Sequence, residues 1–90
     1  MNVAIVGIGL IGGSVAIRLK ETKFADKIIG VDKNEANQKK AIQLGLVDEI
    51  QDLDEAIASC KIIVLTVPVD AIMQLTAYIL DKITDQVIID

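Results

Sequence analysis

The fold of this chain is decided by one stretch of sequence, Val3-Ala4-Ile5-Val6-Gly7-Ile8-Gly9-Leu10-Ile11-Gly12-Gly13-Ser14. Its opening apolar run predicts a strand, and the glycines that follow predict a tight turn leading into a helix. In the spacing G-x-G-x-x-G, Gly7 permits a sharp exit from the strand, Gly9 lets the backbone approach a ligand, and Gly12 lets the helix pack close to the sheet. Such a turn is typical of dinucleotide-binding proteins. The helix beginning near Leu10 would offer unpaired N–H groups and a positive dipole end to a pyrophosphate.

The glycine spacing alone is a weak signal, but an acidic residue strengthens it. Asp32 ends the apolar run at residues 28–31 and lies 20 residues after Gly12, the separation expected for the carboxylate that binds an adenosine ribose. That carboxylate would accept hydrogen bonds from the ribose hydroxyls and repel a 2′-phosphate, which favours NAD over NADP. Lys33 follows directly and would soften the repulsion. Alternatively, Asp32 is a residue at the end of a strand that helps to cap the next helix. The capping role and the ribose-binding role are compatible.

Composition restricts the class of protein. With 90 residues, 52% of them hydrophobic and 2% aromatic, the chain has room for one α/β domain. A net charge of −4 with scattered basic residues makes nucleic acid an unexpected partner. We expect no signal peptide, no membrane span and a cytoplasmic location. A single cysteine, Cys60, and no histidine argue against a disulfide, a zinc site or a catalytic Cys-His pair, and we expect Cys60 to be a small core residue.

Apolar periodicity predicts alternating strands and helices. The strands are expected at residues 2–6, 27–31, 47–50, 61–67 and 86–89, and the helices at 10–21, 35–44, 52–59 and 70–82. Alternation of this kind predicts a Rossmann-like, doubly wound parallel sheet with strand order 3-2-1-4-5. Ligands bind such a sheet at the carboxyl ends of the strands where the winding reverses, so the glycine turn, Asp32 and residues 66–69 should surround one crevice. Thr66, Val67 and Pro68 would border the nicotinamide ribose and ring, or would simply end the strand.

The chain offers no general base for hydride chemistry. Oxidation of an alcohol needs a group that takes its proton, most often histidine, and the sequence contains none. We therefore expect cofactor binding within these 90 residues and the catalytic residues elsewhere.

The sequence resembles the amino-terminal domain of the prephenate and arogenate dehydrogenase family of tyrosine biosynthesis. The resemblance covers essentially the whole chain. It rests on the residues Val6 to Ser14, on Gly30-Val31-Asp32, on Ala41, Leu44-Gly45 and Val47-Asp48, on Val64-Leu65-Thr66-Val67-Pro68-Val69, and on Val87-Ile88-Ile89-Asp90.

The resemblance implies an NAD-dependent oxidative decarboxylation of prephenate to 4-hydroxyphenylpyruvate in the intact protein. By position, Gly7, Gly9, Leu10, Ile11 and Gly12 would hold the pyrophosphate, Asp32 the adenosine ribose, and Thr66 to Pro68 the nicotinamide side. The substrate, prephenate or arogenate, and a homodimer interface would belong to a carboxyl-terminal helical domain absent from this chain. No catalytic or metal-binding residue is assigned here.

Two other hypotheses are consistent with parts of the pattern. Hydroxyacid dehydrogenases and pyrroline-carboxylate reductases share the expected fold and a similar fourth strand end, but Gly13-Ser14 argues against them. A nucleotide-sensing regulatory module of the potassium-transport type would bind NAD or ATP without chemistry, and Pro68 argues against that class.

Overall fold

The computed structural model describes residues 1–89, and within α1 the side chains of Leu10 and Ile11 are not described; Asp90 lies outside the described residues. Nine elements follow one another in the order β1 (Asn2–Val6), α1 (Leu10–Thr22), β2 (Lys27–Val31), α2 (Glu35–Gln43), β3 (Glu49–Ile50), α3 (Leu53–Ser59), β4 (Ile62–Leu65), α4 (Val69–Leu80) and β5 (Val87–Ile89). Among these described residues, no helix combines the length and apolarity needed to cross a membrane.

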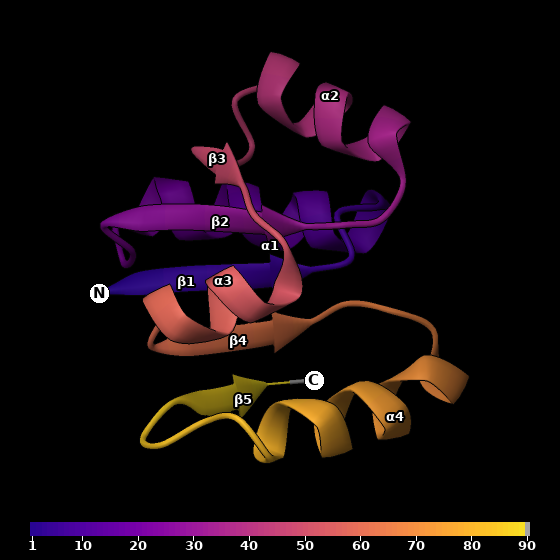
Figure 1. Ribbon diagram of the computed structural model, residues 1–90. Coiled ribbons are helices and arrows are strands. Elements are labelled where there is room, and N and C mark those ends of the chain that lie inside the picture. Colours follow the sequence, from indigo (N-terminus) through magenta and orange to yellow (C-terminus); the bar gives the residue numbers. More distant parts are fainter. Residues whose placement is uncertain (90) are drawn as a thin grey trace.

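The five strands form one parallel sheet in the order β3-β2-β1-β4-β5, which confirms the predicted topology (Figure 1). The central strand β1 pairs with β2 on one side and β4 on the other, so that Val6 lies opposite both Val31 and Leu65. The winding reverses between β1 and β4. The carboxyl ends of β1, β2 and β4 therefore meet at one edge of the sheet, as expected for a ligand site.

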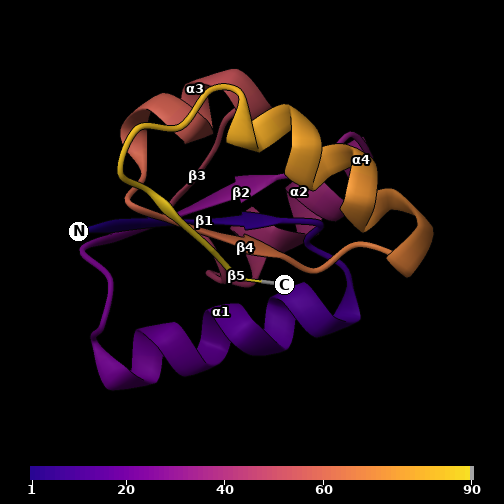
Figure 2. The same cartoon turned by 90° about the horizontal axis from the view of Figure 1, so that it is seen from below.

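Helices cover both faces of the central strands. Figure 2 shows α1 on one side of the sheet and α3 and α4 on the other. Alternate residues of β1 serve the two cores: Ala4 and Val6 join a cluster with residues of α3 and α4, whereas Ile5 joins Ala16 of α1 and Ala41 of α2. Burial on both faces explains why β1 is an unbroken apolar run.

The third strand is shorter than predicted. The backbone N–H of Asp48 donates to the carbonyl of Ile28 at 2.8 Å, and the Asp48 carboxylate accepts the N–H of Ile28 at 2.8 Å. A side chain thus takes the place of one main-chain rung, and pairing through the backbone alone begins only at Glu49. The fourth strand ends at Leu65 rather than at residue 67, and α4 begins directly after Pro68, which has no N–H for a strand ladder.

Capping residues set the helix boundaries as predicted. The Asn34 side chain accepts the N–H of Asn37 and begins α2. Asp52 and Glu55 form a reciprocal capping box at the start of α3. Gly45, with φ +68°, ends α2 in the left-handed conformation that glycine adopts without strain. Cys60 is 3% exposed and belongs to the core, as expected.

Candidate nucleotide-binding site

The site begins where β1 ends, at Gly7. Its N–H donates to the carbonyl of Val31 in β2 at 2.8 Å, and its φ of +91° lies in the region that side chains avoid. A Cβ at this position would come within 2.8 Å of the Thr66 carbonyl oxygen and 2.9 Å of the Val67 side chain. Only glycine therefore permits the chain to leave β1 sharply between β2 and the end of β4.

Gly12 and Gly9 have opposite surroundings. A Cβ on Gly12 would lie 2.1 Å from the carbonyl oxygen of Gly7 and 2.9 Å from the Thr66 hydroxyl, so α1 packs directly on the loop. A Cβ on Gly9 would meet nothing within 4 Å. The chain itself does not need glycine at position 9, which leaves an open backbone surface at the exact place where a ligand would approach.

The first turn of α1 supplies main-chain donors. The first helical hydrogen bond joins the N–H of Gly13 to the carbonyl of Gly9 at 2.8 Å, so the N–H groups of residues 10–12 have no helical acceptor. No acidic residue occupies this turn. The helix dipole adds positive potential, and the turn has the chemistry of an anion site. Leu10 and Ile11 contribute to it through their backbone.

Asp32 lies directly beside the glycine loop. Its Oδ2 accepts the backbone N–H of Ile8 at 2.9 Å, and its Oδ1 accepts the N–H of Asn34 at 2.9 Å. The side-chain amide of Asn37 donates to Oδ2 at 3.2 Å. The N-cap of α2 is Asn34 rather than Asp32, so Asp32 supports the cap only through its hydrogen bond to the Asn34 N–H. Its contact to the loop is one that the sequence did not reveal. Lys33 is exposed beside it.

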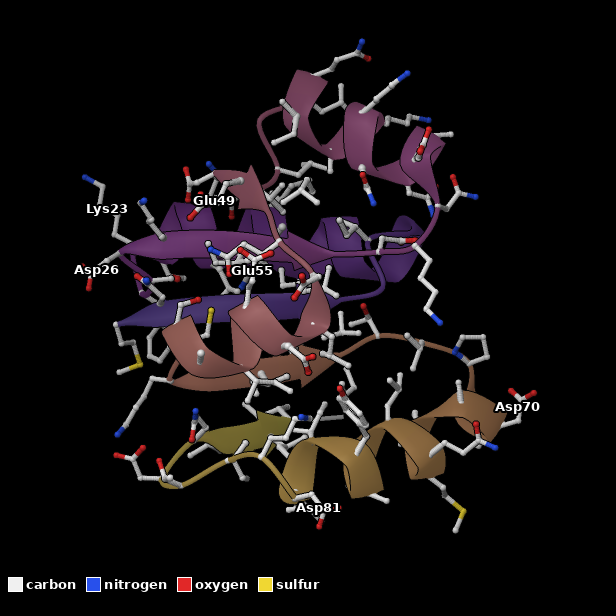
Figure 3. The ribbon with its side chains drawn as sticks, in the orientation of Figure 1. Lys23, Asp26, Glu49, Glu55, Asp70 and Asp81 are labelled. Atoms are coloured by element: carbon white, nitrogen blue, oxygen red, sulfur yellow. The ribbon has the colours of Figure 1, made fainter. Side chains whose placement is uncertain are left out.

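Thr66 does more than end a strand. Its N–H donates to the carbonyl of Val6 at 2.9 Å, and its hydroxyl lies within hydrogen-bond distance of the carbonyl oxygens of Val6, at 3.0 Å, and of Gly7. These contacts fasten the glycine loop to the end of β4. Pro68 is the N-cap residue of α4, and Figure 3 shows Asp70, in the next turn, pointing away from the sheet at this same edge.

A groove extends from the loop along the α1 side of β4. It has a volume of about 870 Å³, and its lining includes Gly9, Thr66, Val67 and Pro68 at one end. Its remaining lining is apolar and comes from β1, α1, the turn after α1, β4 and β5: Val3, Val15, Leu19, Phe24, Ile62, Val64, Leu65 and Ile89. The structure therefore gathers Gly9 and residues 66–68 around one cavity, with Asp32 on the β2 side of the same loop.

Sequence reasoning missed the residues that hold Asp32 and the loop in place. Ile8 contributes its backbone N–H, a group that no side-chain pattern reveals. Its side chain packs against Gly30, where an added Cβ would lie 2.6 Å from Ile8 Cδ1. The Gln38 side chain donates to the main-chain oxygen of Asp32. The sequence contained two signals for these contacts. One is Gly30 inside a buried strand, and the other is the pair of side-chain amides, Asn37 and Gln38, near the start of the next helix.

Together, the parallel sheet, the glycine cradle and the acid at the end of β2 define a Rossmann-type nucleotide-binding domain. The family model described as "Prephenate dehydrogenase, nucleotide-binding domain" matches residues 15–90. The chain belongs to this family. The match begins after the glycine motif, so the motif and the family assignment are separate observations that agree.

Known proteins give the same assignment. The prephenate dehydrogenases of Bacillus subtilis (strain 168) and Lactococcus lactis subsp. cremoris (strain MG1363) are 29% and 31% identical to the chain over 70 and 74 residues, which is 77% and 82% of this chain. The match spans only 19% and 21% of those relatives.

Solved structures extend the comparison. The Aquifex aeolicus prephenate dehydrogenase in complex with hydroxyphenyl propionate and NAD⁺ superimposes with a TM-score of 0.87 at 31% identity, covering 98% of this chain and 32% of that one. The Synechocystis arogenate dehydrogenase gives a TM-score of 0.83 at 30% identity, covering 98% and 31%. Family membership favours the first of the three hypotheses over the other reductases and the sensing module.

Proposed function

We propose that this chain binds NAD at the edge formed by the glycine loop, Asp32 and the end of β4. The single observation that carries the proposal is the Asp32 carboxylate fixed against a cradle of main-chain N–H groups. The cradle suits the pyrophosphate, and the carboxylate suits an adenosine ribose without a 2′-phosphate. The bound NAD⁺ in the Aquifex aeolicus relative supports the same cofactor.

Each site residue then has a defined task. Backbone groups of Gly7, Gly9, Leu10, Ile11 and Gly12 shape and line the pyrophosphate cradle. Asp32 accepts from the ribose, and Lys33 adds a cation at its exposed rim. Thr66, Val67 and Pro68 border the nicotinamide half, where the apolar groove lies close by.

The whole protein, in our proposal, is a prephenate or arogenate dehydrogenase. The chain spans between about a fifth and a third of the length of the relatives it matches. In prephenate oxidation, hydride leaves the ring carbon that bears the hydroxyl, carbon dioxide is lost and the ring becomes aromatic; NAD serves as the hydride acceptor. The groups that bind substrate and take the proton would lie in a carboxyl-terminal helical domain, which would also form a homodimer, and the enzyme would be cytoplasmic.

Calorimetric titration tests the cofactor assignment. NAD and NADH should bind the 90-residue chain more tightly than NADP and NADPH do. Equal or tighter binding of NADP would contradict the proposal. Incubation of the chain with NAD and prephenate should give no NADH absorbance, and measurable turnover would show that the catalytic groups lie within these residues.

A further inference from the structure

The Asp32 carboxylate receives hydrogen bonds from three parts of the chain. Ile8 in the glycine loop donates its N–H at 2.9 Å, Asn34 in the turn after β2 donates its N–H at 2.9 Å, and Asn37 in α2 donates its side-chain amide at 3.2 Å. Rotation of the carboxylate about its side chain would break at least one of these bonds. The orientation of Asp32 is therefore set by its surroundings.

Two of these donors are backbone groups, which every sequence would supply in this conformation. The Asn37 amide is the one side-chain donor among the three. It shares Oδ2 with the N–H of Ile8, whereas Oδ1 receives only the N–H of Asn34 among the described contacts. Since a carboxylate has about four acceptor positions, one position on Oδ1 remains available to a ribose hydroxyl.

Asn37 is itself held firmly. Its backbone N–H donates to the Asn34 side chain at 3.1 Å, and the next residue, Gln38, donates its N–H to the Asn34 carbonyl at 3.1 Å and its side-chain amide to the Asp32 carbonyl. The side chain of Asn37 is half-buried. Helix capping uses only its backbone N–H, so the side-chain amide is not needed to begin α2.

We propose that Asn37 is a positioning residue that sets the preference for NAD over NADP by holding the Asp32 carboxylate toward the ribose. This inference rests on the proposed function. A preoriented acceptor loses less freedom on binding a ribose, and it stays in place where a 2′-phosphate would otherwise push it aside. Without the amide, Asp32 keeps its charge but can turn away.

The experiment measures NAD and NADP affinities by calorimetry for Asn37→Leu, which has similar size but no donor. We expect NAD affinity to fall and the NAD-over-NADP ratio to shrink by roughly three- to tenfold, the range for one lost hydrogen bond. In the Asp32→Ala background, Asn37→Leu should change neither affinity, because the residue acts through Asp32. The matched control is Gln43→Leu, which removes an amide from an exposed position at the end of the same helix, away from Asp32, and should leave the ratio unchanged.

Several results would overturn the inference. An unchanged ratio in Asn37→Leu, or an equal loss in the Asp32→Ala background, would show that Asn37 does not act through the carboxylate. Tighter NAD binding by Asn37→Leu would show that the amide competes with the ribose instead. A shift of the ratio by Gln43→Leu as large as that of Asn37→Leu would assign the effect to general disturbance of α2. Absence of NAD binding by the unmodified chain would overturn the proposed function as well, whereas normal NAD binding with an unaffected Asn37→Leu ratio would overturn this inference alone.

Discussion

The Asp32 carboxylate and the Ile8 backbone N–H are joined by a hydrogen bond of 2.9 Å, which connects the end of β2 to the glycine loop. Asp32 therefore has two effects, and a substitution that removes the whole carboxylate would remove both at once. It supplies a negative charge at the ribose position, and it supplies an acceptor for a donor in the loop. A loss of the acceptor should weaken every dinucleotide, whereas a loss of the charge should change only the choice between NAD and NADP.

Two variants of Asp32 separate these effects. Asp32→Asn can still accept from Ile8 through its amide oxygen but has no charge, and its amide nitrogen would face the N–H of Asn34. We therefore expect a smaller NAD-over-NADP ratio and a loss of stability no larger than that of Asp32→Ala. Asp32→Ala should narrow the ratio too, weaken both cofactors, and reduce the free energy of unfolding by about 1 kcal/mol. Calorimetry and thermal unfolding measure these quantities. An Asp32→Asn variant with the original ratio would show that charge does not determine the preference.

The glycines at positions 9 and 12 should respond differently to alanine. In Gly12→Ala, the new Cβ would lie 2.1 Å from a backbone oxygen of Gly7, so the loop or α1 must move, and we expect a loss of about 1 to 3 kcal/mol of stability. In Gly9→Ala, the Cβ meets no atom of the chain within 4 Å, so stability should change by less than about 0.5 kcal/mol.

The affinity for NAD distinguishes the roles of these glycines further. Gly9→Ala should bind NAD at least about tenfold more weakly, because the methyl group holds the pyrophosphate away from the main-chain donors. Thermal unfolding measures the stability of Gly9→Ala and Gly12→Ala, and calorimetry on the same samples measures their affinity for NAD. A stable Gly9→Ala variant with unchanged NAD affinity would mean that the pyrophosphate does not lie on this cradle.

The sequence was sufficient for the topology but not for the finer contacts of the site. Strand order followed from the alternation of apolar runs and helices, and the roles of Gly7 and Gly12 followed from their spacing. The hydrogen bond from Ile8 to Asp32 could not be predicted, since backbone donors leave no mark in a sequence. The third strand was predicted, but its start at Glu49 was not, for a related reason: Asp48 replaces a main-chain hydrogen bond with its side chain, and an aspartate after an apolar residue is equally typical of a turn.

Lys23 offers a test of backbone strain away from the site. It follows α1 with φ 55°, a conformation that costs a non-glycine residue about 1 to 2 kcal/mol, and Figure 3 shows it at the opposite end of the sheet from Asp70. Lys23→Gly should raise the free energy of unfolding by about 0.5 to 1 kcal/mol after the greater entropy of unfolded glycine is subtracted. Lys23→Ala keeps the strain and is the control. Equal stability of the two variants in urea unfolding would contradict this explanation.

Asp48 should influence acid stability. The backbone N–H of Ile28, assisted by the Lys20 ammonium, lowers the pKa of the Asp48 carboxyl in the folded chain despite partial burial. The unfolded chain therefore binds a proton at Asp48 first as the pH falls. The stabilisation is complete at neutral pH and is lost from about pH 4 downward, through the lower folded pKa.

The variant Asp48→Asn isolates this contribution. It should lose no more than about 1 kcal/mol at pH 7, because the side chain is 40% exposed, and its stability should equal that of the unmodified chain at low pH. Urea unfolding between pH 2 and pH 7 measures the difference, with Asp81→Asn, at the exposed residue that follows α4 (Figure 3), as the matched change. A difference that persists at pH 2 would rule out the titration of Asp48 as its cause.

The edge strand β5 should make the 90-residue chain self-associate. Val87 is 52% exposed and Ile89 is 48% exposed, and Ile89 also lines the apolar groove beside β4. An exposed apolar edge offers unpaired backbone groups and apolar surface to a second copy. Sedimentation should therefore show association that increases with concentration, and Ile89→Lys should reduce it because charge at a sheet edge opposes pairing.

The control is Ile17→Lys, which places the same charge on α1 at a residue that is 46% exposed. Equal effects of the two lysines would assign the association to general surface apolarity rather than to β5, and a monomer at all concentrations would contradict the prediction.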